Sequence, residues 1–155
     1  MLQDLTLACL CLCLSLSALA YADITGTVVE VDDGDTVQIK NADSIVYTVQ
    51  LRCADAPELG QDAGEASAAY LARLIANKSV TVAWEVVNQS GQVSGTIMLR
   101  GSDINFRMIR AGYAWHDADD RCGPAWDTAQ RRAQESGRGL WSAPEPIPPW
   151  DYRSL

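Results

Sequence analysis

Stretches rich in β-branched residues alternate with short polar turns along much of the chain. Ile-Thr-Gly-Thr-Val-Val-Glu-Val, for example, is followed at once by the turn signal Asp33-Gly34. Alternation of this kind between turn residues is typical of half-buried strands and hairpins. The pattern predicts strands at 24–31, 36–39, 45–51, 79–87 and 93–99.

Helical spacing of apolar residues replaces this alternation in three places. The predicted helices are 65–77, a short helix between Asp103 and Gly112, and about 126–136. Five short strands with a helix between the third and fourth are typical of OB-fold barrels. The expected fold is mainly β with helices (α+β): a five-stranded OB-fold β-barrel plus three helices. The proline-rich stretch 144–150 is expected to wrap on this body.

The first 22 residues are predicted to be a signal peptide. A short run of Leu, Ala, Cys and Ser precedes Ala20-Tyr21-Ala22, which has the A-x-A form of a cleavage site. Asp4, in a region that usually carries Lys or Arg, departs from this pattern, and a retained anchor is the alternative. Cleavage leaves 23–155 as one secreted or periplasmic domain, with no membrane association.

Cysteine usage agrees with export. Cleavage removes the cysteines of the leader and leaves Cys53 and Cys122. An even pair in an oxidising compartment favours one disulfide. Two separate buried thiols are the alternative.

Charge sets a limit on partners. The 155 residues carry 12 Lys+Arg against 20 Asp+Glu, a formal charge of −8. Broad neutralisation of phosphates needs the opposite sign, so nucleic acid or nucleotide is a disfavoured partner unless local groups or a metal offset this field. The hydrophobic fraction of 48% excludes a disordered chain.

Two clusters of carboxylates carry candidate chemistry. One is Asp32-Asp33-Gly34-Asp35-Thr36 and the other is Asp55-Ala56-Pro57-Glu58. The first lies at the turn between the first two predicted strands and the second at the end of the third. Since these three strands are successive, Asp35, Asp55 and Glu58 are expected to meet at one edge of the barrel. Their hard oxygen ligands suit Ca²⁺ or Mg²⁺ better than zinc. The alternative is that these carboxylates are solvated turn residues.

His116 is the only histidine. It is expected in a loop or at the surface, so a nucleophile activated by histidine has no support.

The order of motifs resembles the staphylococcal nuclease (thermonuclease) family. The resemblance is carried by Asp33-Gly34-Asp35-Thr36 and Asp55-Ala56-Pro57-Glu58, then by Gly112-Tyr113-Ala114-Trp115, Gly139-Leu140-Trp141 and Pro149-Trp150. It extends from about residue 25 to 153. It implies an OB-fold barrel with three helices and a Ca²⁺-dependent site that cuts DNA and RNA.

The resemblance also assigns roles to individual residues. Asp35 and Asp55 match the calcium ligands, and Glu58 matches the catalytic carboxylate that acts as general base. The family's two phosphate-clamping arginines fall on Gln50 and Gln92. A neutral amide lacks both the charge and the planar fork of a guanidinium. Arg52, two residues after Gln50 on the same strand face, is a candidate substitute.

These residues predict a degenerate nuclease that keeps its calcium-site carboxylates and has weak or no phosphodiester hydrolysis. Its ligand is then calcium, a nucleotide, a glycan or a protein. The alternative is an active Ca²⁺-dependent endonuclease of DNA or RNA with an atypical phosphate clamp. A third reading is a structural envelope domain. The sequence leaves open whether the chain is an enzyme, and we expect a monomer.

Overall fold

A computed structural model describes residues 23–117 and 122–155. The predicted signal peptide, 1–22, lies outside these residues. Within the described ranges, no helix is both long and apolar enough to cross a membrane.

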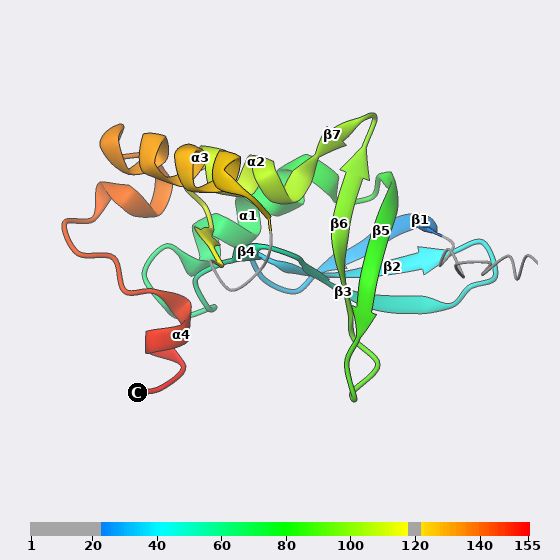
Figure 1. Ribbon diagram of the computed structural model, residues 1–155. Coiled ribbons are helices and arrows are strands. Elements are labelled where there is room, and N and C mark those ends of the chain that lie inside the picture. Colours follow the sequence, from blue (N-terminus) through cyan, green and yellow to red (C-terminus); the bar gives the residue numbers. More distant parts are fainter. Residues whose placement is uncertain (1–22, 118–121) are drawn as a thin grey trace, which may run out of the picture.

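Five strands close into a small barrel (Figure 1). The antiparallel order is β3-β2-β1-β5-β6, and a parallel pairing of β3 with β6 closes the ring. The short strand β7 extends the sheet beyond β6. The expected α+β class and the five-stranded OB-like barrel are therefore confirmed. The strands are β1 Ile24–Val31, β2 Thr36–Asn41, β3 Val46–Leu51, β5 Ser79–Val87, β6 Val93–Leu99 and β7 Ser102–Asp103.

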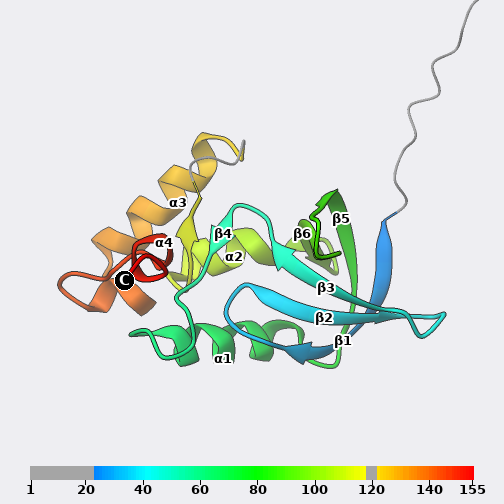
Figure 2. The same ribbon diagram turned by 90° about the horizontal axis from the view of Figure 1, so that it is seen from below.

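The helices gather on one side of the barrel (Figure 2). The three predicted helices are α1 Gly64–Ile75, α2 Ile104–Ala111 and α3 Pro124–Glu135. The described chain also contains a 3₁₀ turn, Gly139–Ser142, and a four-residue helix, α4 Pro149–Tyr152. The proline-rich segment before α4 packs on the body, as expected, since Gln61 Nε2 donates to the Ile147 carbonyl at 2.5 Å.

One core joins the barrel to the helices. Alternate residues of each strand point inward, for example Val37 and Ile39 of β2, and both are fully buried. Leu71 of α1 and Met108 of α2 are buried in the same cluster. The helices thus close one side of the barrel, and α1 also packs against the β1–β2 turn.

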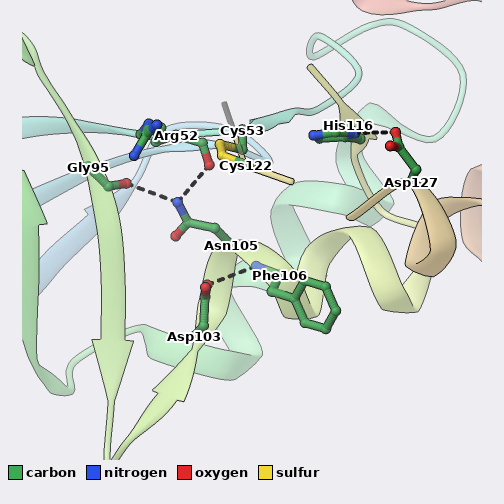
Figure 3. Close-up of a disulfide and its surroundings, with 9 residues drawn as sticks. All are labelled: Arg52, Cys53, Gly95, Asp103, Asn105, Phe106, His116, Cys122 and Asp127. Carbon is green, nitrogen blue, oxygen red and sulfur yellow. Dashed lines mark hydrogen bonds and ion pairs between the residues drawn. A yellow bond between two sulfur atoms is a disulfide. The ribbon is translucent and has the colours of Figure 1, made fainter. Parts of the chain in front are cut away.

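A buried asparagine ties α2 to the barrel (Figure 3). Asn105 Nδ2 donates to the carbonyls of Arg52 and Gly95, each at 2.9 Å, and its Oδ1 accepts from Ile97 N at 3.0 Å. Because buried backbone groups cost free energy when unpaired, this amide fixes the turn after β3 relative to β6.

A second ribbon lies beside the barrel. Strand β4, Ala54–Asp55, pairs antiparallel with β8, Trp115–His116, and places Asp55 opposite Trp115. Trp115 also packs edge-on against Trp141 and Trp150, with ring centroids 4.2 and 5.7 Å apart. This aromatic group holds the C-terminal segment against the strand that carries Asp55.

Candidate functional site

The β1–β2 turn is organised by Asp33. Its Oδ1 accepts from the backbone N–H groups of Asp35 and Thr36, at 2.9 and 2.7 Å. A carboxylate that caps its own turn in this way fixes the backbone of the following residues. Asp35 is therefore presented in a defined orientation.

Gly34 has a packing role beyond the hairpin turn that the sequence indicated. A Cβ at this position would collide with Ser67 of α1 and with Ala56. The close approach brings the turn against the segment that follows β4. The two predicted carboxylate clusters consequently lie next to each other.

Asp35 is held between its own turn and this segment. Its Oδ2 accepts from Ala56 N at 2.6 Å, its Oδ1 accepts from the Thr36 hydroxyl at 2.9 Å, and its carbonyl accepts from Leu51 N at 2.8 Å. Only 6% of its surface is exposed. Burial, together with the nearby charges of Asp33 and Asp55, raises the pKa of Asp35 from 3.8 to about 8.

This shift makes stability depend on pH. The unfolded chain releases the Asp35 proton as pH rises above 3.8. The folded state keeps this proton until the pH approaches 8. The free energy of unfolding of the metal-free protein should therefore fall as pH rises through this window and level off above it. We expect Asp35→Asn to flatten that decline. Urea unfolding in EDTA, at several pH values across the window, measures it.

The exposed turn residue Asp43 offers the control. Asp43→Asn should leave the pH dependence of the urea midpoint unchanged. A decline that persists in Asp35→Asn would assign the effect to other groups.

Asp55 and Glu58 share a cation that sequence reasoning missed. Arg153, just after α4, donates from Nη2 to Asp55 Oδ2 at 2.7 Å and from Nη1 to Asp55 Oδ1 at 3.1 Å. Nη1 also donates to Glu58 Oε1 at 2.6 Å. These two carboxylates raise the pKa of Arg153, which stays charged. The sequence contains only a weak indication of this contact: the proline-rich, apolar segment before Arg153 predicts packing on the body but not the ion pair.

A hollow of about 180 Å³ opens beside this ion pair. The polar and charged residues that line it are Gln50, Arg52, Asp55, Ser94, Asp117 and Arg153. Because β3 ends at Leu51, Arg52 lies in the turn after the strand and not on the strand face expected for it. It still reaches the hollow that Gln50 lines.

Gln92 lies apart from these groups. It is a half-exposed residue of the β5–β6 turn, and its Oε1 accepts from Asn88 Nδ2 at 3.1 Å. It is absent from the lining of the hollow. Gln50, by contrast, pairs with Ser94 of β6 in the strand register and lines the hollow with it.

The predicted disulfide is confirmed: Cys53 and Cys122 are bonded, with Cα atoms 6.3 Å apart (Figure 3). Cys53 has a φ of 64°, a conformation that favours glycine. The bond attaches the turn after β3 to the segment before α3. It thereby fixes one wall of the hollow, which Cys53 also lines.

The surface position expected for His116 is wrong. Only 7% of its surface is exposed, and its Nδ1 lies 3.0 Å from Asp127 Oδ1 (Figure 3). Pairing of β8 with β4 draws the residue inward beneath α3, a long-range effect that local sequence does not show.

The carboxylate oxygens at the site are of the kind that bind a hard divalent cation. Asp35 and Asp55 supply carboxylate oxygens whose negative charges repel one another, and a bound cation would relieve this repulsion. The described residues contain no group of three His, Cys, Asp or Glu side chains arranged to hold a metal. An ion here therefore needs backbone oxygens, water or a bound phosphate to complete its coordination.

Known proteins match most of the chain. The family model described as "Staphylococcal nuclease homologue" matches residues 48–143. An "Uncharacterized endonuclease" of Escherichia coli is 38% identical over 133 residues, covering 85% of this chain and 86% of that protein. One of Haemophilus influenzae is 31% identical over 129 residues, covering 83% and 72%. The rice "Probable staphylococcal-like nuclease CAN2" is 35% identical over 107 residues, covering 69% and 29%.

Proposed function

This chain belongs to the staphylococcal nuclease family, and from that premise we propose that it is a degenerate nuclease, which binds phosphodiesters and hydrolyses them slowly. One observation carries the proposal. Gln50 lines the hollow beside Asp55, at the position of a family arginine, and presents a neutral amide there. The carboxylates of the family site are retained, whereas the positive charge of the arginine that would face a phosphate at position 50 is lost.

The proposed roles follow from chemistry. Glu58, about one-third exposed, accepts a proton from the water that attacks phosphorus. Asp35 and Asp55 are the proposed holders of Ca²⁺, which when bound supplies positive charge against the phosphate oxygens. Glutamine at positions 50 and 92 donates weakly to the charge that develops there. Since one such arginine is worth ~10³–10⁵ in rate, hydrolysis should be slow.

We also propose that the domain acts outside the cytoplasm. The disulfide between Cys53 and Cys122 supports this location, because such bonds persist in oxidising compartments. The leader-like composition of 1–22 supports it as well. The −8 charge then disfavours tight binding to nucleic acid, so the contacts should be local.

A nuclease assay tests the function. The purified protein, given single-stranded DNA or RNA with Ca²⁺, should bind the strand and cleave it slowly, and EDTA should stop the cleavage. Glu58→Gln should abolish the residual cleavage because no general base remains. Glu135→Gln, which removes an exposed carboxylate of α3, is the matched control and should cleave like wild type.

Two results would count against this proposal. Absence of both binding and cleavage would contradict it and favour a protein or glycan partner. Rapid cleavage that Glu58→Gln abolishes would favour the alternative, an active endonuclease with an atypical phosphate clamp. The observation behind that alternative is that Arg52 and Arg153 both line the hollow.

A further inference from the structure

We propose that Arg153 is the residue that binds a substrate phosphate in this protein, in place of the family arginine replaced by Gln50. The inference rests on the proposed function and names the group that makes the contact. It concerns binding of the phosphate and applies whether hydrolysis is slow or fast.

One edge of the Arg153 guanidinium keeps its N–H donors available for a ligand. Arg153 uses the edge formed by Nη1 and Nη2 for the two oxygens of Asp55, and the other Nη1 hydrogen for Glu58. The side edge, formed by Nε and the outer Nη2 hydrogen, has no acceptor among the described residues. Two parallel N–H groups on one planar edge match two phosphate oxygens.

Exposure and position leave this edge within reach of a ligand. The Arg153 side chain is 47% exposed, whereas that of Asp55 is 14% exposed. Arg153 lines the same hollow as Gln50 and Ser94. Asp55 and Asp117 line the hollow as well, so a phosphate there needs the positive charge of the guanidinium to offset their repulsion.

The arginine is also held in place before any ligand arrives. Pro149 is buried, and Trp150 packs against Trp115, the residue that pairs with Asp55 across the β4–β8 ribbon. The bonds to Asp55 and Glu58 then fix the plane of the guanidinium. Pre-organisation of this kind lowers the entropy lost when a ligand is bound.

Binding of a phosphorothioate oligodeoxynucleotide, which resists cleavage, tests the inference. Fluorescence anisotropy in Ca²⁺ gives the dissociation constant of the labelled single strand at several salt concentrations. Arg153→Gln should weaken binding about tenfold and reduce the slope of log K against log salt by about 0.7, the loss of one phosphate contact. Arg153→Lys should keep the slope and bind with intermediate affinity, since it keeps the charge without the fork.

Arg131→Gln is the matched control. It removes an equal charge from the exposed face of α3, where Arg131 lies 4.0 Å from Glu135, and should change neither affinity nor slope by this amount. Thermal unfolding of each variant reports any loss of folding separately.

Each other outcome overturns the inference. An unchanged slope of log K against log salt in Arg153→Gln would show that the arginine serves only the internal ion pair with Asp55 and Glu58. Tighter binding in this variant would make it a latch that blocks the carboxylates. If wild type binds no oligonucleotide, the proposed function fails together with the inference, whereas binding that is insensitive to Arg153 leaves the function standing.

Discussion

A protein in which Gln50 and Gln92 are both replaced by arginine is expected to hydrolyse single-stranded DNA about 10³-fold faster than wild type. The two guanidiniums would restore charge where the phosphate gains it in the transition state. The retained carboxylates already lie together: Asp35 contacts Ala56 N, and Asp55 shares Arg153 with Glu58. The value of kcat/KM in Ca²⁺ measures the gain.

The single substitutions refine this expectation. Gln50 lines the hollow beside Asp55 and Gln92 does not, so Gln50→Arg alone should give the larger gain. Gln50→Lys, with charge but no fork, should give less. Adding Glu58→Gln to the double variant should return the rate to background. A double variant no faster than wild type would show that other parts of the site have also lost their catalytic geometry.

Removing the disulfide should have the largest effect on stability. The bond joins residues separated by 69 positions in the sequence. A loop of that length contributes about 4 kcal/mol through the entropy of the unfolded chain, close to a thousandfold in the folding equilibrium. The double variant Cys53→Ala with Cys122→Ala should lose about that much free energy of unfolding, which urea titration measures.

The conformation of Cys53 gives this test an internal comparison. Because its φ is 64°, glycine fits the position better than alanine does. Cys53→Gly with Cys122→Ala should therefore recover about 1 kcal/mol relative to the double alanine variant. Reductant should destabilise wild type and leave both variants unchanged. Equal stability of oxidised and reduced wild type would contradict the expected contribution.

The main elements of the fold could be predicted because their periodicity is long enough to be read. Strands of six to nine residues and helices of eight to twelve carry a clear pattern. The two-residue strands β4, β7 and β8 carry none, since two residues contain no period. β7 forms a local hairpin with the end of β6, whereas β4 and β8 exist because distant segments pair, and that pairing decides where Asp55 and His116 lie.

The site shows the same division. Asp35 lies in the turn between β1 and β2, and Asp55 comes shortly after β3, so their approach at one edge of three successive strands could be expected. Arg153 lies 98 residues after Asp55, and tertiary contacts of the C-terminal segment, such as the packing of Trp150 on Trp115, bring it back. His116 was misplaced for a similar reason, because its partner Asp127 belongs to α3. Spacing rules cannot report contacts made through tertiary structure.

The contact between Arg153 and Asp55 also has a consequence for the order of events during synthesis. Arg153 is the 98th residue that a ribosome adds after Asp55. Until then, the barrel and its carboxylates can form without the cation that bridges them. Proteolysis just before Arg153 would leave the finished protein in the same condition, with Asp55 and Glu58 present and the bridging cation absent. The chain thus receives the cation of this part of its site last.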